Sequence, residues 1–297
     1  MINKRDDCLK RILLNITDEL SGKDVKYILF NKLKMSAKLV KKLKTCDDGF
    51  MLNSERITVR AVVNKGDVFE VNIPEEKSEN IVPGDIPINV IYEDDDILAV
   101  NKPYDMPTHP SLHHYDNTLA NAVVNYYKGS DFVFRTVNRL DRDTTGVVLI
   151  AKNQYSADLM CRQIRSREIR KTYLAICCGV PNPPTGTIEA PIRRMNDSII
   201  TRMVAKGGQY AKTDYKVLKS KDKFSLVKLI PHTGRTHQIR VHMAHIGHPL
   251  FGDFIYGTEE AGERTRLHCS SLELLHPISG KSITLAADMP DDFFIRL

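Results

Sequence analysis

The chain has 297 residues, of which 43 are lysine or arginine and 37 are aspartate or glutamate, so its formal net charge is +6. Hydrophobic residues make up 42% and charged residues 27%, which excludes a collagen-like, low-complexity or wholly disordered chain. The longest apolar runs are far shorter than the roughly 20 residues of a membrane-spanning helix. The N-terminal residues also lack the apolar core of a secretory signal, so we expect a cytoplasmic protein without a membrane span.

Residues 1–74 predict a small basic module. Apolar residues recur at near-helical spacing between positions 33 and 43 with lysines between them, so a helix here is apolar on one face and basic on the other. Short strands are predicted at residues 50–53, 57–63 and 68–73. The polar segment 75–88 ends in two prolines and a glycine, which is typical of an exposed linker, and we place the domain boundary there.

Residues 89–297 predict a second, larger domain. Strands are expected at residues 97–101, 147–151, 173–178, 224–230 and 283–286, and helices at 119–127, 154–166 and 236–246. These elements lack the regular alternation of a parallel doubly wound sheet, so an α+β domain with a mainly antiparallel mixed sheet fits best. In the last helix we expect Thr236 as the N-cap and Gly247 as the stop.

Cysteine spacing indicates neither zinc nor redox chemistry, because no CxxC pair is present. We expect all six to be reduced packing residues: Cys8, Cys46, Cys161, Cys177, Cys178 and Cys269.

The segment 138–150, NRLDRDTTGVVLI, places two arginines and two aspartates on a loop that enters an apolar strand at Gly146. Flanking arginines favour the charged form of a carboxylate, so this loop is a candidate source of a nucleophile. The alternative is a solvated turn in which Asp143 caps a backbone group and Asp141 pairs with Arg139. The charge pattern alone favours that alternative.

Two more segments carry polar side chains that packing does not explain. Residues 231–240, PHTGRTHQIR, follow a strand and predict an anion site around Arg240. Five histidines lie between positions 232 and 248, but no carboxylate or thiol stands at a known ligand spacing, so we expect no metal. The sequence gives little support for a catalytic Ser/His/Asp triad, because it contains no GxSxG nucleophile elbow. The run RKTY at 170–173 opens a strand whose tyrosine either stacks on a base or, more commonly, fills the core.

Five segments together resemble the RluA family of RNA pseudouridine synthases, in that family's order. They are NKPYDMPTHP at 101–110, NRLDRDTTG at 138–146, KTYLA at 171–175, GRTHQIRVHM at 234–243 and GHPLFGDFIYG at 247–257. The resemblance covers about residues 88–288. More faintly, MSAKLVKKLKTCDDGFMLN at 35–53 resembles an S4 RNA-binding domain, with Asn53-Ser54 in place of its usual Asn-Gly. It implies an S4-like module at 1–74, a linker at 75–88 and a pseudouridine synthase domain at 89–297.

The resemblance implies an isomerase that breaks the N1–C1′ bond of a uridine in RNA, rotates the uracil and rejoins it through C5. This reaction requires no cofactor and no metal. Asp141 matches the family's essential aspartate, Arg240 its basic partner, and Tyr173 the tyrosine that stacks on the uracil. The target must be flipped out of its helix, and Arg139 is placed to fill the vacated space.

The remaining RNA contacts that we expect are, in the catalytic domain, Lys102, Arg235, His237 and Gln238, and in the S4-like module Lys38, Lys41 and Lys42. The partner is structured RNA, with ribosomal RNA favoured over transfer RNA, and we expect a monomer. One position departs from the family, which usually has histidine where this chain has Asn138. Asparagine does not titrate, so a proton-carrying role there is excluded.

Two other readings stay open at this point. A non-catalytic RNA-binding or ribosome-assembly protein could keep the fold, but it would have no chemical need for Asp141, Tyr173 and Arg240 together. A glycoside hydrolase could use Asp141 and Asp143 as its two carboxylates, about 5 to 10 Å apart. That reading leaves the surrounding arginines unexplained.

Overall fold

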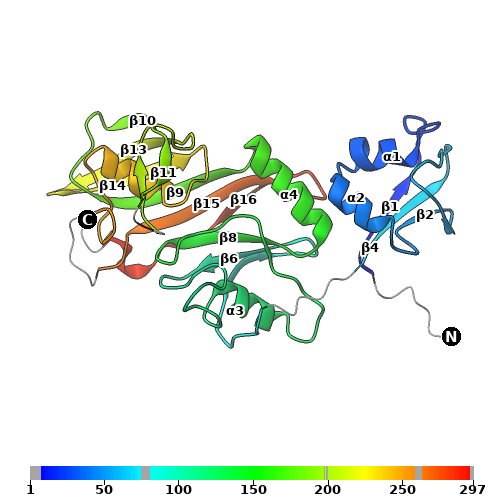
Figure 1. Ribbon diagram of the computed structural model, residues 1–297, viewed down its shortest axis with the longest axis horizontal. Helices are drawn as coiled ribbons and strands as arrows, with labels where there is room; N and C mark the ends of the chain where they lie inside the picture. Colours follow the sequence, from blue (N-terminus) through cyan, green and yellow to red (C-terminus); the bar gives the residue numbers. More distant parts are fainter. Residues whose placement is uncertain (1–7, 75–80, 197, 199, 258–262, 295–297) are drawn as a thin grey trace.

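The computed structural model describes residues 8–74, 81–196, 198, 200–257 and 263–294. A small N-terminal sheet lies at one end of an elongated molecule, and a large twisted sheet occupies the rest (Figure 1). None of the helices in these ranges is long and apolar enough to cross a membrane.

The N-terminal sheet has four antiparallel strands in the order β1-β4-β2-β3. Their bounds are Cys8–Asn15 for β1, Phe50–Leu52 for β2, Glu55–Arg56 for β3 and Val68–Pro74 for β4. The short helices are α1 (Val25–Tyr27), η1 (Ile28–Lys32) and α2 (Ala37–Leu43). The amphipathic helix expected between 33 and 43 is confirmed for α2, which buries its apolar residues and begins at the side-chain cap of Ser36. Sequence periodicity missed β1, α1 and η1.

The strand predicted at 57–63 is wrong. The turn residues Asn53 and Ser54 both have positive φ, 51° and 70°, so the chain reverses at once into β3, which ends at Arg56. The carbonyl groups of Val59 and Ala61 instead accept bonds from backbone N–H groups at the start of α1. These N–H groups have no partner inside their own helix, so the segment serves as a cap rather than a strand.

The large sheet runs in the order β10-β13-β14-β9-β15-β8-β6-β5, with β16 beside β15 and β7 beside β8. The strands are β5 (Asn89–Glu93), β6 (Ile97–Lys102), β7 (Arg135–Thr136), β8 (Thr145–Ala151), β9 (Arg170–Cys178), β10 (Thr185–Glu189), β13 (Lys212–Lys221), β14 (Phe224–Pro231), β15 (Leu267–Leu275) and β16 (Ser282–Ala286). Among these pairs β15 and β8 are parallel and the others antiparallel, which confirms the α+β, mainly antiparallel expectation.

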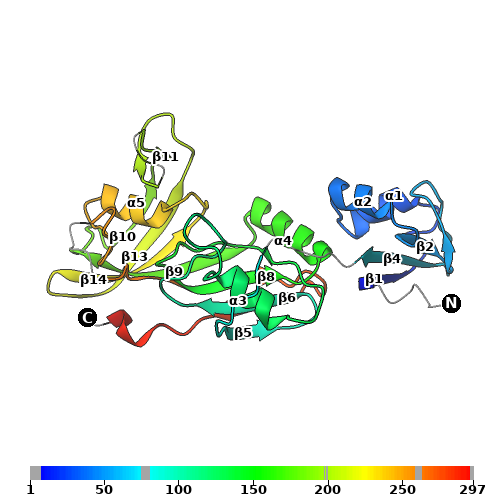
Figure 2. The same cartoon turned by 60° about the horizontal axis from the view of Figure 1, so that its bottom comes forward.

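Helices α3 (Leu119–Tyr126), α4 (Gln154–Ser166) and α5 (Gln238–His245) lie close to their predicted ranges, and η2 (Asp291–Phe294) follows β16. A hairpin of β11 (Ile192–Arg194) and β12 (Arg202–Val204) projects from the sheet beside α5 (Figure 2).

The N-cap expected at Thr236 is wrong. Helix α5 starts at Gln238, and its N-cap is His237 in a left-handed conformation without a side-chain cap. Instead, the Gln238 side chain accepts hydrogen bonds from the Thr233 hydroxyl and the Arg235 amide, which closes the preceding loop. The stop at Gly247 is confirmed by its φ of 82°, which follows the last residue of the helix.

Gly146 allows β8 to approach β15. A Cβ atom at this position would lie 2.2 Å from the carbonyl oxygen of Cys269, and φ is 111°. Cys269 is in register with Gly146 on one side and with Tyr173 on the other, so three strands meet in one row behind the pocket described below. Cys177 and Cys269 are buried as expected, but Cys161 is exposed on α4 and is not a packing residue.

Helix α4 joins the two sheets. Tyr155 and Leu159 pack into the core of the N-terminal sheet, and the Tyr155 hydroxyl donates to the carbonyl of Leu33 at 2.8 Å. Lys10 of β1 reaches Asp96 beside the large sheet, with an N–O distance of 2.9 Å. The division into 1–74, 75–88 and 89–297 stays a prediction. Residues 75–80 of the expected linker lie outside the described residues.

Candidate active site

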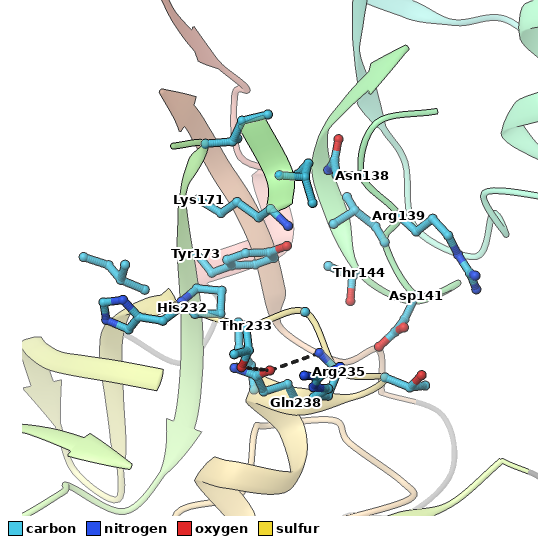
Figure 3. Close-up of a pocket in the computed structure, with 18 of the residues that line it drawn as sticks. Asn138, Arg139, Asp141, Thr144, Lys171, Tyr173, His232, Thr233, Arg235 and Gln238 are labelled. Atoms are coloured by element: carbon cyan, nitrogen blue, oxygen red, sulfur yellow. Dashed lines mark hydrogen bonds between the residues drawn. The ribbon is translucent and has the colours of Figure 1, made fainter. Parts of the chain in front are cut away.

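A pocket of about 870 Å³ opens on the large sheet where three chain segments meet. They are the loop 137–144 before β8, the first residues of β9, and the loop 230–240 that leads into α5. The sequence had singled out these three segments separately for their chemistry. Figure 3 shows Tyr173 of β9 and Asp141 of the facing loop on different sides of this space.

The loop that carries Asp141 is held from behind by Lys102. The Nζ atom of Lys102 donates to the carbonyl oxygens of Pro103, Met106 and Arg142, at 2.8, 2.7 and 3.0 Å. The side chain is 0% exposed. The expectation that Lys102 contacts RNA is therefore wrong, because three backbone acceptors surround its ammonium group inside the protein.

We expect Lys102→Met to lower the free energy of unfolding by roughly 2 to 4 kcal/mol, because three buried carbonyl oxygens lose their donor. Burial lowers the pKa of Lys102 from 10.5 to about 7. Between these values the unfolded chain binds more protons than the folded one, so raising the pH stabilises the wild type and not the variant. Urea unfolding at pH 7 and pH 9 should show a difference that grows with pH, and a constant difference would contradict this assignment.

Asp141 faces two side chains from the start of α5. Its Oδ2 atom lies 3.8 Å from Nη1 of Arg240 and 3.9 Å from Nε2 of His237, and its side chain is 31% exposed. The expected pairing of Asp141 with Arg240 is thus present as a long ion pair. The alternative interpretation paired Asp141 with Arg139, but the described residues show no ion pair between these two side chains.

Arg240 is fixed by a carboxylate that the sequence analysis did not single out. Its Nε and Nη2 atoms donate to the two carboxylate oxygens of Asp253, both at 2.7 Å, and Asp253 is fully buried. Although burial acts to lower the pKa of Arg240, the hydrogen bonds and charge of Asp253 raise it overall, so the guanidinium stays charged. The signal was present in the sequence, since Asp253 stands in the quoted run GHPLFGDFIYG.

Tyr256, from the same run, positions the ring of His237. The Tyr256 hydroxyl accepts from the backbone N–H of Arg202 at 2.9 Å and lies 2.8 Å from Nδ1 of His237. This contact turns the other ring nitrogen, Nε2, toward Asp141. Burial lowers the pKa of His237, in agreement with a neutral ring.

Tyr173 is 8% exposed and still lines the pocket, so it is a core residue with one edge open to a ligand. Burial raises the pKa of its hydroxyl well above the ordinary value. Lys171 lines the pocket from the same strand, two residues earlier and therefore on the same face (Figure 3). Burial lowers the pKa of Lys171. Lys171 opens the motif KTYLA at 171–175, but the sequence did not identify it as a site residue.

The other expected RNA contacts fall into different positions. Arg139 is exposed, and in Figure 3 its side chain extends away from Tyr173. Gln238 is 5% exposed and its amide nitrogen donates to Lys212 and Thr213, so it holds the loop instead of standing free. Arg235 lines the pocket and bonds the Tyr210 carbonyl.

Lys38, Lys41 and Lys42 lie on α2, apart from the pocket. Lys38 and Lys41 are exposed, whereas Lys42 is half-buried and donates to the side chain of Gln154 at 3.1 Å. The first two are therefore placed to meet a ligand, and Lys42 joins α2 to α4.

The two-carboxylate reading fails on geometry. Asp143 is buried, pairs with Arg142 at 3.1 Å and is not among the residues that line the pocket. In the described part of the chain, one group of potential metal ligands comes together, namely Asp94, Asp96 and His276. It lies outside the pocket, and its members already bond to one another and to neighbouring side chains.

Comparisons with known proteins agree on one family. The family model of RNA pseudouridylate synthases matches residues 96–245. An uncharacterized RNA pseudouridine synthase of Bacillus subtilis is 36% identical over 265 residues, covering 88% of this chain and 94% of the relative. The ribosomal large subunit pseudouridine synthase D of Pasteurella multocida is 36% identical and covers 82% of this chain and 80% of its own length. The solved structure of human RNA pseudouridylate synthase domain containing 1 superposes with a TM-score of 0.59 at 30% identity, over 70% of this chain and 84% of that one.

Proposed function

This chain belongs to the RNA pseudouridylate synthase family and is an isomerase that acts on RNA, and we propose that it converts uridines of large-subunit ribosomal RNA to pseudouridine, with Asp141 as the nucleophile. The observation that carries the proposed mechanism is the half-exposed carboxylate of Asp141 in a pocket opposite Tyr173, with the charged Arg240 beside it. The ribosomal substrate is supported by the names of relatives such as the Pasteurella multocida enzyme.

The proposed reaction is balanced within the nucleotide. The Asp141 carboxylate forms a covalent bond to the target nucleotide, the N1–C1′ bond breaks, and the uracil turns while it stacks against the ring of Tyr173. When C5 then bonds to C1′, the bond to Asp141 breaks and the free carboxylate is restored. The hydrogen on C5 leaves to solvent as a proton, and N1 takes up a proton. Arg240 places its positive charge 3.8 Å from this carboxylate, on the side of the pocket where the proposed attack takes place.

Access to the pocket requires that the uridine leave its helix. The reacting atoms are hidden in a stacked helix, and unstacking costs a few kcal/mol. Arg139 is exposed next to Asp141 and can occupy the space that the base vacates or contact the phosphate.

The direct test is release of tritium from 5-tritiated uridine in a transcript of bacterial large-subunit ribosomal RNA. We expect tritium release to stop after a small whole number of uridines per transcript. In a map of cellular RNA, we expect pseudouridine at the same positions in cells that carry the gene and uridine there in cells that lack it. Release from transfer RNA only would replace the proposed substrate. Release from neither RNA would contradict the proposed activity.

A further inference from the structure

Helix α4 runs from the N-terminal sheet to the rim of the pocket. Gln154, Asp158, Arg162 and Arg165 follow one another at intervals of four, four and three residues, so they form one stripe along the helix. The first three contact the N-terminal part: Gln154 bonds Lys42, Asp158 accepts from the amide of Ser36, and Arg162 donates to the carbonyl of Lys34. Arg165 lines the pocket. The position of α4 between the two parts is visible in Figures 1 and 2.

The C-terminal part of this stripe carries an excess of positive charge. Residues 162–171 contain five basic side chains and one acidic side chain, Glu168. Four arginines in this range are exposed, and we call them the arginine ridge: Arg162, Arg165, Arg167 and Arg170. The last three line the pocket, and none of them makes an ion pair within the described residues. Guanidinium groups without carboxylate partners repel one another, and phosphate groups are their natural counter-charges.

At its other end the ridge meets the basic face of the N-terminal module. The bond between Arg162 and the backbone of Lys34 brings the two surfaces into contact. Lys34, Lys38 and Lys41 are exposed on the module side and continue the positive charge along α2. Exposed basic side chains therefore lie on both sides of the contact between Arg162 and Lys34, and the packing of α4 in the core of the N-terminal sheet holds them there.

We propose that the arginine ridge binds the sugar-phosphate backbone of the substrate RNA strand between the flipped uridine and the segment held by the N-terminal module. This proposal rests on the proposed function and names the path of the substrate. From Gln154 to Arg165 the helix rises about 16.5 Å. At the roughly 3.4 Å per nucleotide found along one strand of B-form DNA, this length corresponds to about five stacked nucleotides.

The test compares the salt dependence of RNA binding between full-length variants, with a large-subunit ribosomal RNA transcript as the probe. Each lost phosphate contact should reduce the slope of log K against log salt by about 0.7, so Arg165→Ala/Arg167→Ala should lose about 1.4 and bind roughly 25-fold more weakly at 0.1 M salt. The matched control is Lys219→Ala/Lys221→Ala, which removes two exposed charges at the far end of β13. Equal losses in the two variants would overturn the proposal.

Two further binding experiments distinguish a specific RNA path along the ridge from nonspecific electrostatic attraction. Arg165→Lys/Arg167→Lys should recover most of the binding, because lysine still meets a phosphate as a point charge. Arg162 does not line the pocket, so a short uridine hairpin that fills the pocket alone should bind Arg162→Ala as it binds the wild type, whereas the long transcript should bind this variant more weakly. An equal loss on both RNAs would confine the arginines to the pocket and overturn the path.

Binding is read independently of turnover, so failure of this proposal can be told from failure of the proposed function. If the wild type is active and the alanine variant binds RNA with the same salt slope as the wild type, the ridge proposal is rejected and the proposed function stands. A reduced slope in a protein that releases no tritium supports the ridge and rejects the proposed reaction.

Discussion

Asp141→Asn is expected to abolish tritium release from uridine-labelled ribosomal RNA, with a loss of turnover on the order of 10⁴-fold or more. The substitution keeps the shape of the side chain and removes the negative charge that faces both Arg240 and His237. An amide is a far weaker nucleophile than a carboxylate, so no covalent step should follow binding. Affinity for the transcript, measured by filter binding, should change little. Turnover within tenfold of the wild type would reject Asp141 as the nucleophile.

The control for this experiment is a second carboxylate of the same pocket. Asp214 lines the pocket and pairs with His232 at 2.6 Å, so Asp214→Asn also removes one negative charge. Because this carboxylate already has a partner and lies outside the Asp141–Arg240 contact, we expect a change of a few-fold at most. A larger loss for Asp214→Asn than for Asp141→Asn would move the chemistry to the other side of the pocket.

Arg240→Gln should lower both stability and turnover. Removing one member of a buried ion pair leaves the other charge uncompensated and typically costs about 3 to 5 kcal/mol. Here the remaining charge would be Asp253, which is fully buried. Turnover should fall as well, because Asp141 loses the guanidinium that faces it. Thermal unfolding and single-turnover kinetics at a temperature where the variant is folded would measure the two effects separately.

The double variant Arg240→Gln/Asp253→Asn tells the two roles of Arg240 apart. The asparagine oxygen can still accept from the amides of Ile255 and Tyr256, so the loop keeps those bonds while the pair becomes neutral. We expect most of the lost stability to return and turnover to stay low. Recovery of turnover together with stability would mean that Arg240 acts only through the fold and not on Asp141.

Local sequence patterns determined much of the architecture. The helix 154–166 was predicted at its observed bounds from its apolar face, and the structure adds the side-chain cap of Asn153. The strand at 57–63 failed because an apolar run with β-branched residues does not reveal that its carbonyl groups cap a helix more than thirty residues earlier. The N-cap at Thr236 failed for a related reason, since a glutamine side chain closes that turn.

The sequence predicted which main residues belong to the candidate site, but not which of them hold the others in position. Motif resemblance named Asp141, Tyr173 and Arg240, and the structure places all three at one pocket. The same motifs contained Asp253 and Tyr256, but their function depends on which atoms they meet across the fold. No local pattern distinguishes a buried aspartate that holds an arginine from an exposed one.

The sequence by itself determined the family and the reaction class and named the candidate residues for the chemistry, because these follow from residue types in a fixed order along the chain. Only the tertiary structure decided that Lys102 lies inside the protein, since burial depends on the three carbonyl groups that the fold brings around its ammonium group. The tertiary structure also decided that Asp143 is buried away from the pocket. It further decided that α4 packs against the basic N-terminal module and extends to the pocket. The charge and spacing of the residues follow directly from the sequence, whereas the solvent exposure of each charged group depends on how the chain packs.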